Sequence, residues 1–191
     1  MILEIVKYGH PVLREKGQRV APITAAIRQL AADMLATMYA ADGVGLAAQQ
    51  IGRAILLTVI DVSISEQEWT ITPALPMPLV LVNPVLSQPL GEQTGSEGCL
   101  SIPEVSAQIR RANQVTVRAE NLDGQPIEFQ ATGLLARAAQ HEIDHLNGIL
   151  FIDRMDAATK ASFSGKLKKL QKETVATLGK TASARRPLVK A

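Results

Sequence analysis

His141-Glu-Ile-Asp-His145 is the stretch of this 191-residue chain from which the fold and the chemistry are most readily predicted. Residues four apart on an α-helix lie on one face, about one turn apart, so the two imidazoles can bind one metal ion. Glu142 lies beside them as a base for a water molecule that the metal activates. The motif is short and also occurs by chance, but two histidines at this spacing favour a metal site over hydrogen-bonded core residues.

Cys99 is the only cysteine in the chain and the candidate for a third ligand. A lone cysteine is more often a small buried hydrophobic residue, but beside two histidines its thiolate would complete a three-ligand site. A closed structural site would need a fourth protein ligand, and only one other histidine, His10, exists. An open coordination position indicates catalysis. A single free thiol also fits a reducing compartment.

The glycine-rich run Gly43-Val-Gly-Leu-Ala-Ala-Gln-Gln-Ile-Gly52 permits three interpretations. It could be a turn between a helix and a strand, where side chains do not fit. A phosphate-binding loop is disfavoured because the run lacks Gly-Lys-Ser/Thr. The third interpretation is a loop that brings backbone close to an extended substrate and directs a side-chain amide at the site.

Apolar periodicity predicts an α+β fold. Helices are expected at Thr24–Tyr39, Thr132–Leu146 and Ala157–Leu178. Strands are expected at Ile55–Val62, Leu79–Val85, Val105–Ile109 and Val115–Ala119, with a hairpin over Val115–Gln130 and an irregular loop over Ser63–Pro78. This order predicts antiparallel sheets packed around a central metal-binding helix, with an N-terminal helix and a C-terminal helix.

The net charge of +2 is unevenly distributed. The segment from Lys160 to Ala191 has nine basic residues and one acidic residue, a charge of +8, so residues 1–159 carry −6. This basic segment could be a solvated helix with a frayed end, or it could dock on an anionic partner such as ribosomal RNA. The chain has no run of 18 apolar residues, so we expect no membrane span. Its N-terminus lacks the features of a secretory signal or transit peptide.

Three separated runs together resemble the peptide deformylase family. They are G-x-G-L-A-A-x-Q-x-G at Gly43–Gly52, E-G-C-L-S at Glu97–Ser101 and H-E-x-D-H at His141–His145, in the family's order. The resemblance covers about residues 1–155. Ser106 departs from the pattern, since many members have an arginine there near the substrate cleft, so a substrate contact at this position is in doubt.

The resemblance implies a metal site with a defined set of residues. Cys99, His141 and His145 would bind one divalent metal ion, natively Fe²⁺, for which Zn²⁺, Ni²⁺ or Co²⁺ can substitute. Glu142 would take a proton from water and pass it to the leaving amine. The Gln50 side-chain amide and the Leu100 backbone N–H would stabilise the developing oxyanion.

The resemblance also implies a substrate, which is the N-terminal formyl-methionine of newly made polypeptides, with formate as a product. The region of Gly45 and the stretch after Leu100 would pair with the extended peptide. Val44, Leu134, Ala138 and the His141 ring are the expected lining of the methionine pocket.

The expected organisation is a catalytic domain over residues 1–155, followed by a basic C-terminal helix and flexible tail over residues 156–191. Related deformylases use a C-terminal helix to dock near the ribosomal tunnel exit, so the ribosome is a candidate partner. We expect neither a DNA partner nor a membrane partner, and a cytoplasmic, bacterial type of protein.

Two other functions compete with this hypothesis. The first is a different H-E-x-x-H hydrolase, such as a zinc endopeptidase; a cysteine as third ligand argues against it. The second is a non-catalytic binding protein of the same fold; against it, every candidate ligand and Glu142 are present. Release of formate, as opposed to internal peptide cleavage or mere binding, separates the three.

Overall fold

The computed structural model describes residues 1–184, with side chains to residue 180. The strands are β1 (Gly45–Ala47), β2 (Leu57–Ile60), β3 (Trp69–Thr72), β4 (Leu79–Leu90), β5 (Gln93–Cys99), β6 (Ile102–Arg111), β7 (Gln114–Glu120) and β8 (Pro126–Thr132). The helices are α1 (Ala25–Ala40), α2 (Gly133–Leu146), α3 (Ala157–Ser162) and α4 (Ser164–Ala184), with 3₁₀ turns at Pro11–Arg14, Ala48–Ile51 and Phe151–Asp153. In this part of the chain no helix is long and apolar enough to cross a membrane.

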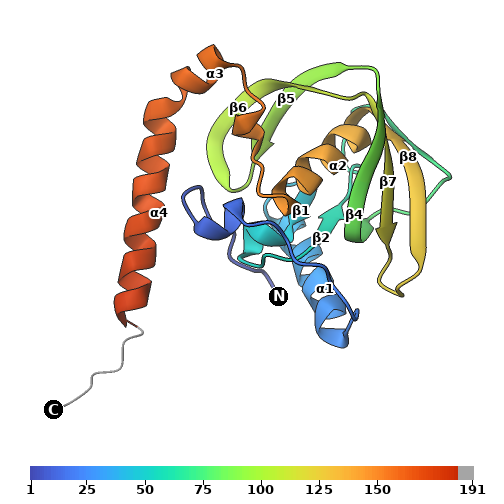
Figure 1. The fold of residues 1–191 in the computed structure, drawn as a ribbon, viewed down its shortest axis with the longest axis horizontal. Coiled ribbons are helices and arrows are strands. Elements are labelled where there is room, and N and C mark those ends of the chain that lie inside the picture. The colour runs from blue at the N-terminus through green and yellow to red at the C-terminus, as the bar shows by residue number, and fades with distance from the viewer. Residues whose placement is uncertain (185–191) are drawn as a thin grey trace.

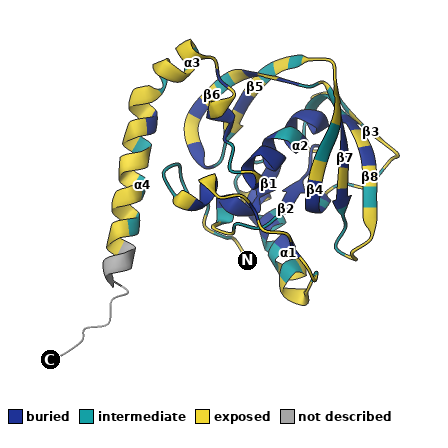
Figure 2. Cartoon of the chain, viewed as in Figure 1, coloured by how far each residue is buried: buried dark blue, intermediate teal, exposed yellow. Residues whose placement is uncertain are grey.

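The predicted α+β class is confirmed, with α2 at the centre of two antiparallel sheets. One sheet has six strands in the order β1-β2-β4-β7-β8-β3, and the other consists of β5 and β6. Figure 1 shows α2 enclosed between them, with α1 and the C-terminal helices at the periphery. Eleven of the fourteen residues of α2 are buried, which is why this helix is dark along most of its length in Figure 2 while α4 is largely exposed.

Both predicted helices of the main body are confirmed to within a residue at each end. The side chain of Thr24 caps α1 by accepting a hydrogen bond from the Ile27 N–H, and α2 ends at Asn147-Gly148, where Gly148 has a φ of 74°. The turn after α1 differs from expectation in one detail. Its left-handed residue is Asp42, with a φ of 53°, and not one of the glycines that follow.

The predicted hairpin over Val115–Gln130 is present as β7 and β8, paired from Gln114↔Thr132 to Glu120↔Pro126. The side chain of Asn121 shapes its turn by accepting hydrogen bonds from the backbone N–H groups of Asp123 and Gln125. This hairpin packs its inner face on α2 and so forms part of the core around that helix.

Three strands were missed by the sequence prediction. One is β1, which lies in the glycine-rich run that was interpreted as a turn or a loop. The segment Ser63–Pro78, expected as a loop, contains β3, an edge strand that pairs with β8. The strand β5 was not predicted because its sequence, Gln-Thr-Gly-Ser-Glu-Gly-Cys, has few residues that favour strands. It is held by its pairing with β6 from Gln93↔Arg111 to Gly98↔Ser106. The expected strands at 79–85 and 105–109 are also longer in the structure, reaching Leu90 and spanning Ile102–Arg111.

The C-terminal segment, predicted as one helix over Ala157–Leu178, is two helices that meet at Phe163. Phe163 keeps right-handed helical angles, with φ −91° and ψ −2°, so the break is confined to one residue. The apolar side chains of Phe163, Leu167 and Leu170 pack in one cluster with Ile102 and Val105 of β6. The end of the predicted tail, residues 185–191, lies outside the described residues.

Candidate active site

The three candidate ligands converge although they come from separate elements. Cys99 ends β5, whereas His141 and His145 lie one turn apart on α2. One potential ligand atom of each residue lies within 4.8 Å of the others, and Cys99 Sγ is 3.3 Å from His145 Nε2. The two imidazole rings are edge to face, with centroids 5.0 Å apart. Two imidazoles and one thiolate suit a transition-metal ion and leave a coordination position open, so these residues fit the metal that the sequence predicts.

Glu97 orients His141. Its Oε2 atom is 3.0 Å from His141 Nδ1, which leaves Nε2 of the ring available as the ligand atom. The hydrogen bonds from Arg111 and His141 outweigh the effect of burial and hold the pKa of Glu97 far below its usual range. Burial alone would lower the pKa of His141, but its neighbours Cys99 and Glu97 raise it to about 10. A metal ion that binds this ring must therefore displace a proton.

A buried ion-pair network fixes Glu97 and ties β6 to α2. Arg111 donates to both carboxylate oxygens of Glu97, each at 2.9 Å, and its third contact, at 2.5 Å, is to Asp144. Asp144 in turn accepts from Arg154, and Arg137 donates to Glu97 at 2.7 Å. The sequence prediction assigned none of these roles. Asp144 lies inside the H-E-x-D-H motif and Glu97 two residues before Cys99, and that proximity is the signal that could have found them.

Glu142 has the environment of a general base. Its carboxylate is almost fully buried, and Oε2 has no hydrogen-bond partner among the described residues. Burial, assisted by the charge of Glu97 and opposed by that of His141, raises the pKa of Glu142 to about 7. A carboxylate with a pKa near neutrality can both accept and return a proton at physiological pH.

Gly45 makes room for Glu142. A Cβ atom at residue 45 would lie 2.8 Å from both Cγ and Cδ of Glu142, closer than real contacts of this kind. The glycine-rich run therefore includes a strand, β1. The absence of a side chain at Gly45 of this strand leaves the space that the Glu142 carboxylate occupies. Because β1 is an edge strand of the six-stranded sheet, its second edge is not used for pairing within that sheet.

We expect Gly45→Ala to lower kcat/KM for a reaction catalysed at this site by about 10–100-fold, because the new methyl displaces the Glu142 carboxylate, and a misplacement of about 1 Å can cost about 10²-fold. Steady-state kinetics at matched metal content would measure this. Gly165→Ala is the matched control, since it adds the same methyl where no atom lies within 4 Å. Parental activity in Gly45→Ala would show that the position of Glu142 does not depend on this contact.

Gln50 and Leu100 are both held by the N-terminal arm, the segment that precedes the 3₁₀ turn at Pro11–Arg14. Gln50 Oε1 accepts from the Ala47 N–H at 2.8 Å, which directs Nε2 toward Cys99 Sγ, 3.4 Å away. The backbone N–H of Val6 donates to Gln50 O at 2.8 Å. The neighbouring Lys7 ammonium donates to Leu100 O at 2.9 Å. The arm thus fixes both segments that were predicted to stabilise an oxyanion.

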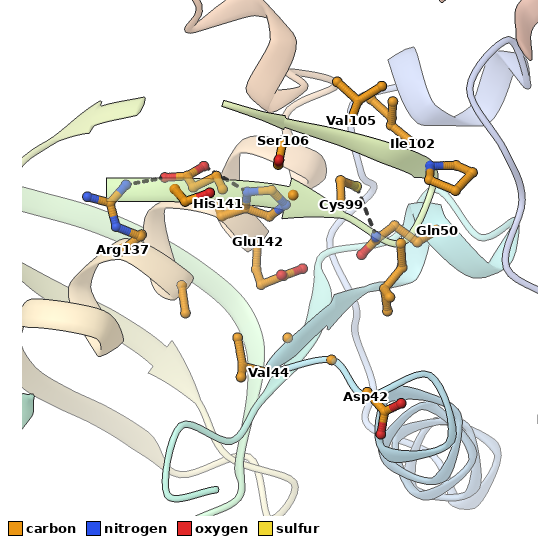
Figure 3. A pocket seen from close by; sticks show the side chains of 18 of the residues that line it. Asp42, Val44, Gln50, Cys99, Ile102, Val105, Ser106, Arg137, His141 and Glu142 are labelled. Carbon is orange, nitrogen blue, oxygen red and sulfur yellow. Dashed lines mark hydrogen bonds and ion pairs between the residues drawn. The ribbon is translucent and has the colours of Figure 1, made fainter. Parts of the chain in front are cut away.

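A pocket of about 760 Å³ opens onto this cluster. It is lined by nine of the ten predicted site residues, namely Val44, Gly45, Gln50, Cys99, Leu100, Leu134, Ala138, His141 and Glu142. The tenth, His145, is fully buried beneath it. Ser106 also lines the pocket, so this departure from the family pattern faces the same space. Figure 3 shows Cys99, His141 and Glu142 around the pocket, with Val44 opposite and Gln50 beside Cys99.

The family, the relatives and the solved structure that this chain matches are all peptide deformylases. The family described as polypeptide deformylase matches residues 2–161. A peptide deformylase of Syntrophobacter fumaroxidans is 45% identical, covering 92% of this chain and 99% of the relative. One from Opitutus terrae is 43% identical, covering 91% of this chain and 95% of the relative. The crystal structure of a peptide deformylase from Legionella pneumophila is similar with a TM-score of 0.77 and 35% identity, covering 98% of this chain and 100% of that chain.

Proposed function

The chain belongs to the peptide deformylase family, and from this premise we propose how its residues carry out the reaction. The enzyme removes the formyl group from the N-terminal formyl-methionine of newly made polypeptides and releases formate. The observation that carries the proposed assignment of roles is that Cys99, His141 and His145 converge at the pocket beside the buried carboxylate of Glu142.

Cys99, His141 and His145 are the proposed ligands of one divalent ion, Fe²⁺ in the cell, with Zn²⁺, Ni²⁺ or Co²⁺ as substitutes. When bound, such an ion polarises a carbonyl and lowers the pKa of water. The mixed thiolate and imidazole set supports a transition metal over Mg²⁺ or Ca²⁺, which prefer oxygen ligands. Elemental analysis of protein purified without exposure to air tests the assignment of iron.

Glu142 is proposed to take the proton from the attacking water and to deliver it to the departing amine. Its buried carboxylate and raised pKa support both transfers. The Gln50 Nε2 group and the Leu100 backbone N–H donate hydrogen bonds to the carbonyl oxygen as it gains charge. Both segments are fixed by the N-terminal arm, which supports a preorganised pair of donors.

The peptide is proposed to bind in an extended conformation along the free edge of β1 at Gly45, with the stretch after Leu100 on its other side. An edge strand offers unpaired backbone groups to such a peptide, as in other proteins that bind by strand addition. Val44, Leu134 and Ala138 form the apolar part of the methionine pocket. Incubation of metal-loaded protein with a formyl-Met peptide, followed by formate and mass analysis, separates this activity from that of an endopeptidase.

Residues 1–155 are the proposed catalytic domain, and residues 156–191 are a basic C-terminal segment, with α3 and α4 in its described part, whose proposed partner is the ribosome. The position of this segment supports an outward role, because Lys168 and Lys172 are one turn apart on α4 and exposed. A bacterial-type, cytoplasmic location is part of this proposal, since formylated chains are made on the ribosome there.

Replacing Lys168 and Lys172 by glutamine should weaken ribosome binding and lower the slope of log affinity against log salt by about one per lysine, because phosphate contacts release counterions. Co-sedimentation at several salt concentrations measures this. The double variant Lys16→Gln and Arg53→Gln removes the same charge from exposed positions on the body and serves as the control. Equal binding by all three proteins would mean that the basic helix face is only a solvated surface.

A further inference from the structure

Arg137 places a guanidinium group in the wall of the pocket that we propose for methionine. It lies on α2 one turn before His141, between Leu134 and Ala138, and its side chain is only 8% exposed. It nevertheless lines the pocket together with these residues. Figure 3 shows Arg137 at the end of the pocket away from Gln50, with a dashed line to its carboxylate partner. An apolar methionine pocket alone has no use for this group.

The hydrogen bonds of Arg137 use one of its three nitrogen atoms. Among the residues that the structure describes, Nη1 donates to Glu97 Oε1 at 2.7 Å, to Ile109 O at 3.0 Å and to Gly95 O at 3.4 Å. The Nη2 and Nε atoms lie against Gly95, where a Cβ would come within 3.0 Å and 3.3 Å of them. An arginine has five N–H donors, so those on Nη2 and Nε remain for another acceptor.

Neutralising Glu97 does not account for Arg137. Glu97 already has Arg111 on both carboxylate oxygens at 2.9 Å and His141 at 3.0 Å. Arg137 is a second arginine on a carboxylate that is already paired, so its own charge is only partly compensated. A buried donor in this state favours a ligand atom that accepts a hydrogen bond, because charge-assisted hydrogen bonds are the stronger ones.

We propose that Arg137 determines specificity for first side chains that end in a hydrogen-bond acceptor, and that the enzyme therefore also deformylates chains that begin with oxidised methionine. The inference rests on the proposed function, because it concerns the same pocket. A thioether sulfur accepts weakly, a sulfoxide oxygen accepts strongly, and the norleucine side chain, which has the shape of methionine, accepts nothing. Arg137 thus lets a polar side chain enter the part of the pocket where Val44, Leu134 and Ala138 supply apolar lining.

Three peptides that differ only in the first residue test the proposal: formyl-Met-Ala-Ser, formyl-norleucine-Ala-Ser and formyl-methionine sulfoxide-Ala-Ser. In the metal-loaded parent, kcat/KM for the sulfoxide should be no more than about tenfold below that for norleucine. A larger deficit would overturn the proposal without any variant being needed. In Arg137→Met the ratio of sulfoxide to norleucine should fall by about 10–100-fold, the worth of a hydrogen bond to a charged group.

Ratios within one protein separate specificity from a merely structural role, since loss of the Glu97 contact would lower turnover of all three peptides alike. Arg110→Met is the matched control, because it makes the same substitution at an exposed arginine that does not line the pocket, and it should leave the ratio of sulfoxide to norleucine unchanged. A second measurement uses binding of the product peptides. In NMR titrations of metal-free protein, the affinity for Met sulfoxide-Ala-Ser relative to that for norleucine-Ala-Ser should also fall in Arg137→Met.

Two outcomes would contradict the proposed role of Arg137. An equal change for all three peptides in Arg137→Met would overturn this inference and leave the proposed function standing. No turnover of any formyl peptide by the metal-loaded parent would overturn the proposed function and the inference together.

Discussion

Glu142→Gln should lower kcat/KM for formyl-Met peptides by about 10²–10⁴-fold, the usual effect of removing a general base. Glutamine keeps the shape of the side chain beside Gly45, so packing is preserved, but it cannot take a proton. Metal content should remain near that of the parent, because Glu142 is proposed as a base and not as a ligand. Stopped assays of formate release together with metal analysis measure both quantities on the same preparation.

The matched control for Glu142 is Glu128→Gln, which removes an exposed carboxylate on β8 that pairs with Arg118. It should have little effect on turnover. Near-parental activity in Glu142→Gln would remove this residue from the mechanism. A joint loss of metal and activity would instead make the carboxylate a ligand or a structural support.

Cys99→Ser should remove most of the bound metal and lower activity by more than about 100-fold. Removing a hydrogen-bond partner outside the coordination sphere typically lowers metal affinity or activity by about 10–100-fold, and removing a ligand lowers them further. A hydroxyl is a weaker ligand than a thiolate for the borderline metals that two imidazoles and one sulfur select. Metal per chain by elemental analysis and kcat/KM by formate release are the measurements.

Ser101→Ala serves as the control for Cys99, because it changes a nearby buried residue whose side-chain oxygen has no hydrogen-bond partner among the described residues. It should retain metal. Full metal content and activity in Cys99→Ser would contradict the three-ligand site, and the two histidines would then need another partner.

The helices were predictable from the sequence because their signals are local. In α2 the apolar spacing and the stop at Asn147-Gly148 both lie within or next to the segment itself. The strand β5 has no such signal. Its residues are polar or glycine, and its conformation follows from pairing with β6, so only knowledge of the partner strand would reveal it.

Some of the site residues were likewise predictable from local sequence signals, and others were not. The candidate ligand pair on α2 follows from helical spacing, and Cys99 is a candidate because it is the single thiol in the chain. The roles of Gln50 and Leu100 came from the family resemblance, not from any local pattern. The contacts of Glu97 with Arg111 and Arg137, which lie 14 and 40 residues further along the chain, depend on tertiary structure and could not be read from spacing.

The N-terminal arm has a consequence for the order in which the molecule is assembled. Val6 and Tyr8 are synthesised before their hydrogen-bond partners Gln50 and Ser101, and the last of the three candidate ligands, His145, is synthesised later still. The arm therefore cannot form these hydrogen bonds until the chain has been synthesised well beyond it. Contacts of such long sequence separation form slowly because a large loop must be closed. Docking of the arm on Gln50 and Ser101 is therefore expected to be a late step in the folding of a newly made copy of this enzyme.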